Sequence, residues 1–236
     1  MNKNLNKNGI TTQDDLYNFK SFGKFKPHRF KKILKNIPKN KPIKLLDVAC
    51  GEGQFYDILK KYRDNIEYCG IDISKKQIEI SNKKGYTAKI QDVTTKWDFG
   101  DETFDIIICA EIIEHIFDTD FFLKQANRVL KKNGTMILTT PNIASAGDRL
   151  RLLLGNRPSA IEYTARVKDS GHIRAFVYDE LFNLLKFNHF RQIKILGRDF
   201  YMPLFRHEMK YFGKINDFFA KIFPKLSAGF IVIAKK

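Results

Sequence analysis

Residues 45–55 read LLDVACGEGQF, and this stretch decides the fold. Asp47 ends a short apolar run, Gly51 and Gly53 form a turn, and a helical segment follows. Glycines in such a turn permit positive φ and let backbone N–H groups approach a ligand closely. The stretch therefore predicts a nucleotide-like ligand at the end of a buried strand.

The turn is not a complete dinucleotide-binding fingerprint. The pattern G-x-G-x-x-G, started at Gly51, requires a glycine where the chain has Tyr56. A glycine pair alone is weak evidence, so the kind of ligand has to be inferred from the segments that follow.

Short apolar runs alternate with helical segments along the chain, which is typical of α/β proteins. Ile106–Ala110 is apolar without alternation, as expected of a central strand covered on both faces. We predict a Rossmann-like α/β fold with a seven-stranded, mostly parallel sheet, flanking helices and an inserted helical cap at about 142–177. The runs expected as strands lie at 44–48, 68–73, 87–93, 104–110, 134–140, 192–197 and 229–236.

Helical spacing and capping residues predict the elements between these runs. The expected helices cover about 54–63, a segment from Ser74 to Gly85, a segment ending at Asn133-Gly134, and 178–187. Residues 1–40 are expected to form a polar leader and one amphipathic helix, and 41–236 a single domain that includes the cap.

The bulk composition sets limits on the class of protein. No run of about 18 apolar residues is present, and the N-terminus MNKNLNKNGI is not a signal peptide, so we expect a cytoplasmic protein. The three cysteines lack the spacing of a zinc or redox site. A formal charge of +16 favours anionic partners, although abundant Lys and Asn also fit compositional drift.

Carboxylates recur where successive apolar runs end. Asp72 ends the second run, Asp92 the third and Glu111 the fourth. Open α/β sheets bind ligands at the carboxyl ends of their strands, and a carboxylate at Asp72 can accept hydrogen bonds from both ribose hydroxyls. We expect one crevice; the alternative is a set of unrelated surface acids that cap loops.

The ordered segments DVACGEG (47–53), GIDIS (70–74), QDV (91–93), FDIIICAEIIEH (104–115) and GTMILTTPN (134–142) resemble the motifs of class I methyltransferases that use S-adenosylmethionine (SAM). The similarity covers about residues 44–143. EIIEH (111–115) and GHIRAF (171–176) are most similar to bacterial ubiquinone-biosynthesis-type O-methyltransferases and to methyltransferases of glycans and small metabolites.

The resemblance implies contacts to the methionine end of SAM. Asp47 and the backbone at Ala49, Gly51 and Gly53 would hold this end, and Glu111 would line the passage towards the sulfonium. Alanine at position 49 replaces the more usual glycine.

The resemblance also implies contacts to the adenosine of SAM. Asp72 would bind the ribose, and Ile73 would pack on the adenine. Asp92 would accept a hydrogen bond from the adenine amino group, and the Val93 backbone would contact the ring edge.

Transfer to a hydroxyl needs a base or a metal ion that removes the proton of the acceptor. His115 is the nearest candidate base. Glu111, Glu114 and His115 could form a base dyad or, as the resemblance to quinone O-methyltransferases implies, a site for a divalent cation such as Mg²⁺. His172 is a second catalytic candidate. For each histidine the alternative is a packing or helix-capping role.

Two further segments suggest partners. The cap carries a local charge of +3, which would suit a phosphate-bearing acceptor; its charged residues are Arg149, Arg151, Arg157, Arg166, Lys168 and Arg174 against Asp148, Glu162 and Asp169. Residues 204–226 have a basic amphipathic pattern that would pack on the sheet or the cap, or would contact the inner membrane surface peripherally. Its apolar residues are Phe205, Met209, Phe212, Ile215, Phe219, Ile222 and Phe223.

The sequence therefore predicts a SAM-dependent methyltransferase, acting by in-line transfer on an oxygen of a small-molecule, sugar or lipid-linked acceptor. Two alternatives stay open. One is RNA methylation, suggested by the net charge although the sequence has no separate RNA-binding module. The other is a SAM-binding partner protein without chemistry of its own.

Overall fold

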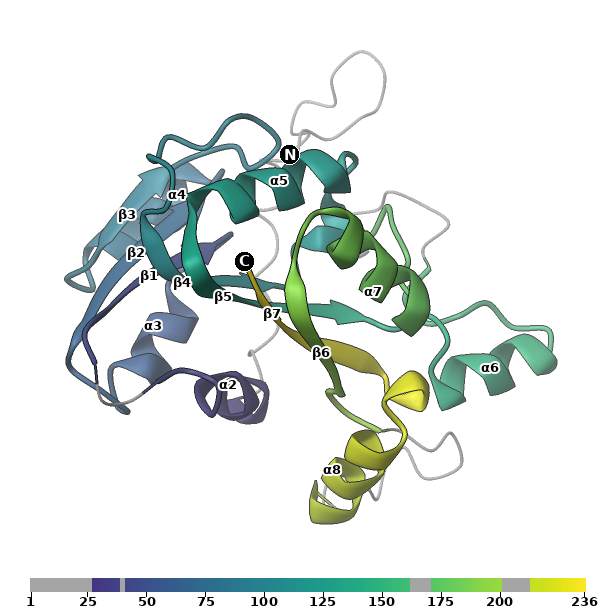
Figure 1. The fold of residues 1–236 in the computed structure, drawn as a ribbon. Coiled ribbons are helices and arrows are strands. Elements are labelled where there is room, and N and C mark those ends of the chain that lie inside the picture. Colours follow the sequence, from purple (N-terminus) through teal and green to yellow (C-terminus); the bar gives the residue numbers. More distant parts are fainter. Residues whose placement is uncertain (1–26, 39–40, 162–170, 201–212) are drawn as a thin grey trace, which may run out of the picture.

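The computed structural model describes residues 27–38, 41–161, 171–200 and 213–236. These residues contain a seven-stranded sheet in the order β3-β2-β1-β4-β5-β7-β6 (Figure 1). Strands β1 to β5 pair in parallel, and β7 is antiparallel to both β5 and β6. The predicted fold class is confirmed. The strands are β1 Ile43–Val48, β2 Ile66–Asp72, β3 Thr87–Ile90, β4 Phe104–Ala110, β5 Leu130–Pro141, β6 Arg191–Gly197 and β7 Gly229–Lys235.

Helices cover both faces of the sheet (Figure 1). On one face lie α5 (Thr119–Val129) and α7 (Tyr178–Phe187), and on the other lie α2 (Pro27–Leu34), α3 (Gln54–Leu59) and α4 (Lys75–Asn82). This arrangement explains the unbroken apolar run in β4, because each face of that strand enters a different core.

Capping residues fix two of the helix starts. The Ser74 hydroxyl accepts a hydrogen bond from the Gln77 N–H at the start of α4, as the sequence predicts. The Asp118 carboxylate accepts one from the Phe121 N–H at the start of α5. Both helices therefore begin just beyond the carboxyl edge of the sheet.

The end of α5 differs from the prediction. The helix was expected to run to Asn133-Gly134, but it ends at Val129, and Leu130 is already extended. The N–H of Thr103 bonds to the carbonyl of Val129, so the loop before β4 satisfies a carbonyl at the helix end. Asn133, at φ 61°, and Gly134 instead lie within β5, where the pairing with β4 is irregular between Leu130 and Thr135. Asn133-Gly134 therefore belong to an irregular part of the strand and not to the helix end.

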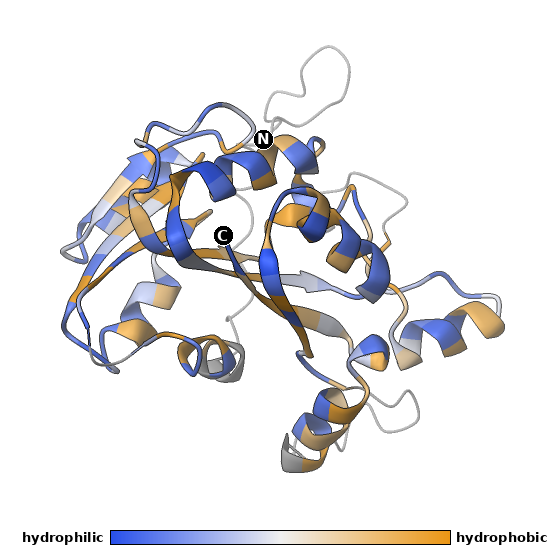
Figure 2. Ribbon diagram, viewed as in Figure 1, coloured by the Kyte–Doolittle hydropathy of each residue, from blue (hydrophilic) through white to orange (hydrophobic). Residues whose placement is uncertain are grey.

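Beyond the central sheet, α6 (Ala146–Leu153) lies within the predicted cap, and α8 (Gly213–Ile222) with the short η3 helix (Pro224–Leu226) precedes β7 (Figure 1). Residues 162–170 and 204–212 lie outside the described residues, so the boundaries of the cap and of the 204–226 amphipathic stretch stay predictions. Hydrophobic residues interrupt the polar surface of both helices (Figure 2).

The described part of the 204–226 stretch is only partly packed. Ala220 is buried against the end of β6, and Phe219 contacts Phe200 and Phe223. Ile215 and Ile222 stay about half exposed. None of the helices in the described ranges has the length and apolar character needed to cross a membrane.

Gly197 sets how closely α8 can approach β6. A Cβ at this position would meet the Ala220 carbonyl and would lie 2.9 Å from the Ser227 Cβ. Gly197→Ala should therefore destabilise the fold by about 1–3 kcal/mol, measured by urea unfolding. Gly100→Ala is the matched control, since a Cβ there has only one ordinary contact, 3.5 Å from the Thr103 hydroxyl. Equal stability of the two variants would contradict this interpretation.

Candidate active site

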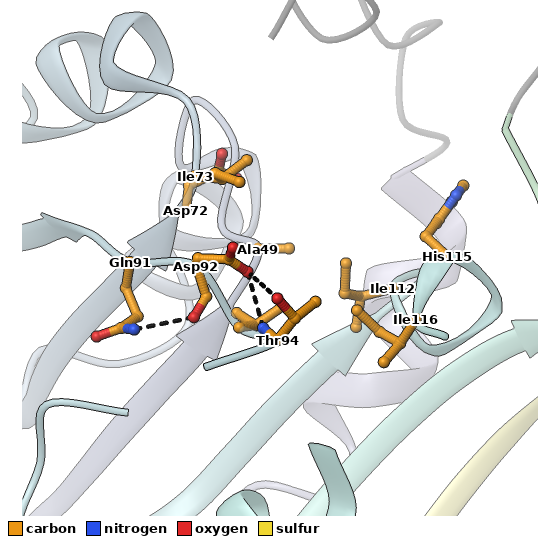
Figure 3. Close-up of a pocket in the computed structure, with 10 residues that line it drawn as sticks. Ala49, Asp72, Ile73, Gln91, Asp92, Thr94, Ile112, His115 and Ile116 are labelled. Atoms are coloured by element: carbon orange, nitrogen blue, oxygen red, sulfur yellow. Dashed lines mark hydrogen bonds between the residues drawn. The ribbon is translucent and has the colours of Figure 1, made fainter. Parts of the chain in front are cut away.

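Two adjoining clefts lie at the carboxyl edge of the sheet. They share four lining residues, which are Ala49, Asp72, Ile112 and His115. The first cleft (Figure 3) also has Ile73, Gln91, Asp92, Val93, Thr94 and Ile116. The second also has Phe30, Asp47, Cys50, Gly51, Glu52, Gln54, Phe55, Gln77, Ala110 and Glu111. The predicted cofactor residues, with the exception of Gly53, therefore line one continuous region.

The glycine turn folds back onto the end of β2. Ala49 and Gly51 both have positive φ, 58° and 53°, so the unusual alanine adopts a left-handed backbone. The Gly51 N–H donates to Asp72 Oδ2 at 2.9 Å. Gly53 has φ 73°, and a Cβ there would clash with Tyr86. Packing and backbone conformation, rather than the clefts, explain the glycine at position 53.

Asp72 is held by two backbone N–H groups. Oδ2 accepts from Gly51, and Oδ1 accepts from Ser74 at 2.9 Å. Burial raises the pKa of this carboxyl, although the two hydrogen bonds oppose the shift. Each carboxylate oxygen has a further lone pair, so the side chain can still accept from the two hydroxyls of a ribose.

Asp47 lies at the end of β1 and is only 3% exposed. The Tyr68 hydroxyl donates a hydrogen bond to Asp47 Oδ2. Burial raises the pKa of Asp47 to about 7; the Tyr68 hydrogen bond lowers it and the Asp72 charge raises it further. A buried carboxylate with this pKa is well suited to a cationic ligand group, because an ammonium would stabilise its charged form. The methionine ammonium of SAM fits this position.

The first cleft combines apolar walls with two hydrogen-bonded carboxylates, Asp72 and Asp92. The side chains of Ile73, Val93 and Ile112 line it. Asp92 Oδ1 accepts hydrogen bonds from the Thr94 N–H at 2.8 Å and the Thr94 hydroxyl at 2.7 Å (Figure 3). An apolar slot with a polar edge suits a purine ring, which agrees with the adenine contacts that the sequence implies.

Glu111 is held by Thr139 of β5 and by Arg198, which directly follows β6. It has φ 54°, its Oε1 accepts from the Thr139 hydroxyl at 2.8 Å, and it forms an ion pair with Arg198. Arg198 also donates to Asp199 at 3.1 Å. Burial alone would lower the pKa of Arg198, but the charges of Glu111 and Asp199 raise it. Glu111 therefore lines the second cleft with its negative charge balanced by Arg198.

Arg198 is a site residue that the sequence reasoning missed. It follows β6 directly, at the same edge as the carboxylates, and it is 4% exposed. A Cβ at Gly229 would lie 2.6 Å from its guanidinium carbon, so the glycine leaves room for it. A polar Arg198-Asp199 pair at the end of a predicted strand was the available signal.

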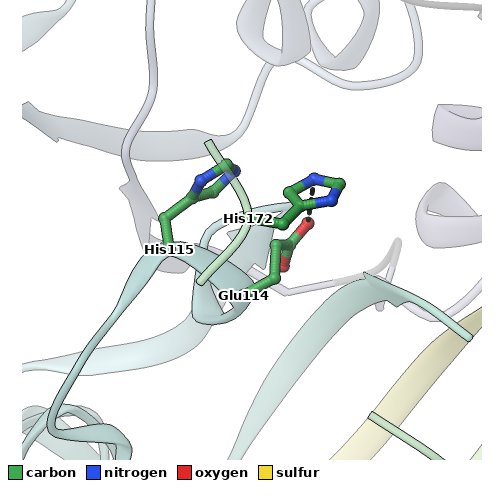
Figure 4. A group of neighbouring side chains, drawn as sticks. All are labelled: Glu114, His115 and His172. Carbon is green, nitrogen blue, oxygen red and sulfur yellow. Dashed lines mark ion pairs between the residues drawn. The ribbon is translucent and has the colours of Figure 1, made fainter. Parts of the chain in front are cut away.

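His115 and His172 come together beside Glu114 (Figure 4). The two rings are 5.0 Å apart, and His172 Nε2 is 4.0 Å from Glu114 Oε1. His115 Nδ1 lies 2.9 Å from the Gly171 carbonyl, and His172 Nδ1 lies 3.1 Å from the Ala160 carbonyl. Each Nδ1 therefore carries a proton, and each Nε2 has the lone pair when the ring is neutral.

The predicted metal set is only partly brought together. Glu114 and His115 have ligand atoms within 4.8 Å of one another, but the third member of the group is His172 and not Glu111. Glu111 is bound by Arg198 instead. His172 is not among the residues that line the two clefts. It borders the site through its contacts with His115 and Glu114.

Glu114 is buried, and burial together with the nearby Glu111 charge holds its pKa well above the usual range. Its Oε2 accepts from the Thr140 hydroxyl at 3.0 Å, whereas Oε1 has no hydrogen-bond partner among the described residues. This unpartnered oxygen is the one nearest His172.

The described arginines of the cap bind backbone carbonyls. Arg149 donates to Ala144 at 2.8 Å, Arg151 donates to the carbonyl of Arg157 at 2.9 Å, and Arg174 donates to that of Ile116 at 3.1 Å. Arg166 and Lys168 lie outside the described residues. The phosphate-bearing acceptor stays a prediction that none of these contacts supports.

The fold and the site identify the class of protein. Residues 22–194 match a family model described as a methyltransferase domain. The chain belongs to this methyltransferase-domain family, and the predicted class I SAM-dependent methyltransferase is confirmed.

Particular relatives agree with this assignment. The chain is 36% identical over 140 residues to a ubiquinone biosynthesis O-methyltransferase of Pelagibacter ubique, covering 52% of this chain and 57% of the relative. It is 32% identical over 131 residues to a demethylmenaquinone methyltransferase of Staphylococcus aureus, covering 52% and 53%. The chain thus spans about half the length of the curated relatives it matches.

Solved structures share the fold. A SAM-dependent methyltransferase from Archaeoglobus fulgidus aligns with TM-score 0.63 at 19% identity over 89% of this chain and 92% of that chain. A [4+2]-cyclase aligns with TM-score 0.60 at 19% identity over 89% and 81%. Since one of these proteins is a cyclase, the fold by itself does not determine the reaction.

Asp47→Asn should stabilise the ligand-free protein increasingly as pH rises. The folded pKa of Asp47 is about 7, whereas an unfolded aspartate titrates near about 3.9. The stabilisation that protonated Asp47 gives the wild-type fold is complete below the pKa of the unfolded state. It is lost as pH rises through the folded pKa of about 7. The variant should therefore gain up to roughly 4 kcal/mol above that pH, measured by urea unfolding.

The matched control for this experiment is Asp64→Asn, at an exposed position. This variant also removes one carboxylate, but from a position that water reaches. A pH-independent difference for Asp47→Asn would contradict the assigned pKa.

Proposed function

We propose that this chain transfers the methyl group of SAM to a hydroxyl oxygen of a small-molecule acceptor. The observation that carries the proposal is the position of His115. It lines both clefts, and its Nδ1 is tied to the Gly171 carbonyl at 2.9 Å, which turns the basic Nε2 away from that bond. A histidine thus lies where the two clefts meet, and its basic nitrogen is the one not bonded to Gly171.

SAM would place its adenine in the first cleft and its methionine end in the second. Asp47 would pair with the ammonium, Asp72 would accept from the ribose, and Asp92 with Ile73 and Val93 would hold the adenine. SAM, when bound, supplies a methyl group that its sulfonium already activates. The protein then has to orient the acceptor and keep it in line, which positioning alone can accelerate strongly.

The catalytic half assigns proton removal to His115. A neutral imidazole with Nδ1–H fixed to a carbonyl has its lone pair on Nε2, which can accept the hydroxyl proton as the oxygen becomes methylated. Glu111 is held by Arg198, so it would shape the second cleft and take no part in this transfer. His172 would restrain the His115 ring and is proposed as a positioning residue.

The acceptor class rests on the relatives. A ubiquinone biosynthesis O-methyltransferase and a demethylmenaquinone methyltransferase are both named for quinone-type molecules. A small aromatic acceptor with a hydroxyl group would suit both these names and a histidine base.

A divalent cation at Glu114, His115 and His172 is a second proposal for proton removal. Its support is the 4.8 Å cluster, the unpartnered Glu114 Oε1, and the two Nδ1–H groups fixed by carbonyls, which is how metal-bound histidines are commonly oriented. One oxygen and two nitrogens suit Zn²⁺ or Mn²⁺ better than Mg²⁺. Such an ion would polarise the acceptor hydroxyl.

His115→Asn should lower the rate of S-adenosylhomocysteine release by roughly 100- to 10,000-fold with catechol and other phenols as acceptors, while SAM affinity stays within about threefold. The matched control is His189→Asn, because His189 is exposed, lies outside both clefts and has φ 64°, which asparagine tolerates. Chelator treatment of wild type separates the two proposals, since a base alone needs no ion.

An unchanged rate for His115→Asn would contradict the assignment of the base. SAM binding without release from any acceptor would favour the alternative of a binding protein. Methyl incorporation into RNA that weakens steeply with salt would favour the RNA alternative.

SAM affinity should fall as pH drops below about 7, because protonation of Asp47 removes the partner of the ammonium. Tyr68→Phe removes a hydrogen bond that favours the charged carboxylate, so the midpoint should move upward by about one pH unit. Calorimetric titration across this range measures the shift. Exposed Tyr62, changed to Phe, is the matched control, and identical midpoints in all three proteins would refute the pairing.

A further inference from the structure

The end of α6 displays three consecutive leucines to solvent. Leu152, Leu153 and Leu154 are 56%, 81% and 67% exposed. Successive helical residues lie about 100° apart, so three in a row surround most of the helix end with apolar surface. Exposed apolar clusters of this kind mark interaction surfaces on otherwise polar proteins.

Positive charge surrounds these leucines. Arg149, Arg151 and Arg157 are all exposed, and Asp148 is the one acid between residues 145 and 161. Asp148 is buried; its carboxylate accepts from the Ser145 hydroxyl at 2.8 Å and from the Ser159 N–H at 2.7 Å. The exposed part of this tip is therefore cationic and aliphatic.

The tip is a defined structure rather than a loose loop. The N–H of Asn156 donates to the Arg151 carbonyl at 2.7 Å, and Arg151 donates to the Arg157 carbonyl at 2.9 Å. Pro158 is buried, and Gly155 ends the helix with φ 73°. The leucines are held outward by these contacts, and they need no change of fold to meet a partner.

The tip is connected to the candidate site. His172 Nδ1 is 3.1 Å from the carbonyl of Ala160, so the segment after α6 borders the histidine pair. At the other end of the cap, Asn142 donates to the carbonyls of Lys225 and Ser227, which places the start of α6 beside η3 at the carboxyl edge of the sheet. In Figure 1, α6 projects outward from this end of the sheet.

We propose that the α6 tip, residues 149–157, docks the protein peripherally on an anionic lipid bilayer. Aliphatic side chains would enter the acyl boundary, while the three arginines would lie among lipid phosphates. An anionic membrane is favoured over a protein partner because residues 149–157 combine leucines with cations and include no acidic and no aromatic residue. A bilayer at this tip would lie close to the end of the cap that borders the site.

Vesicle sedimentation with the full chain tests the proposal, and it does not depend on methyl transfer. Wild type should bind phosphatidylglycerol vesicles, and it should bind phosphatidylcholine vesicles of the same size much more weakly. Leu152→Ser, Leu153→Ser and Leu154→Ser combined should lower the partition coefficient at least about tenfold. Arg149→Gln, Arg151→Gln and Arg157→Gln combined should lower it by at least about tenfold on the anionic vesicles.

Two controls keep the outcome interpretable. Tyr62→Ser with Phe187→Ser removes large exposed side chains that lie elsewhere on the surface, and it should leave binding unchanged. Circular dichroism melting should show that all variants are folded, as expected when only exposed side chains change.

Three results would overturn the proposal. The first is a leucine variant that binds anionic vesicles as wild type does. The second is equal binding of wild type to neutral and anionic vesicles. The third is a wild-type dimer, measured by light scattering, that becomes a monomer in the leucine variant. The tip would then be a contact between two copies of the chain.

Discussion

Burial of carboxylates at one edge of the sheet is the constraint on which the site depends. Asp47 and Asp72 end neighbouring strands and lie almost wholly out of water. Burial raises the pKa of both side chains, that of Asp47 to about 7, so the ligand-free protein holds its charges there at a cost. A ligand that brings an ammonium and two hydroxyl donors relieves that cost.

The remaining parts of the site are held by contacts between segments that are far apart in the chain. Arg198, after β6, neutralises Glu111, after β4, and Gly229 at the start of β7 leaves space for the guanidinium. The Gly171 carbonyl likewise orients His115 through a hydrogen bond from Nδ1, although the two residues are far apart in the chain. The last two strands and the end of the cap thus form the side proposed for the acceptor, while the first three strands form the side proposed for SAM.

This division explains what could be predicted from the sequence. Asp47, Gly51 and Asp72 belong to continuous strand–turn–helix segments, so local pattern and resemblance were sufficient to place them in one crevice. The partner of Glu111 was not predictable in this way, because Arg198 lies 87 residues away and meets it only through the sheet order. The grouping of His172 with Glu114 has the same origin.

A crystal structure of the full chain with S-adenosylhomocysteine tests the central claim most directly. The account predicts the amino-acid end at Asp47, both ribose hydroxyls within hydrogen-bond distance of Asp72, and the adenine between Ile73 and Val93, with the sulfur facing His115. A ligand bound elsewhere, or a ribose that makes no contact with Asp72, would contradict it.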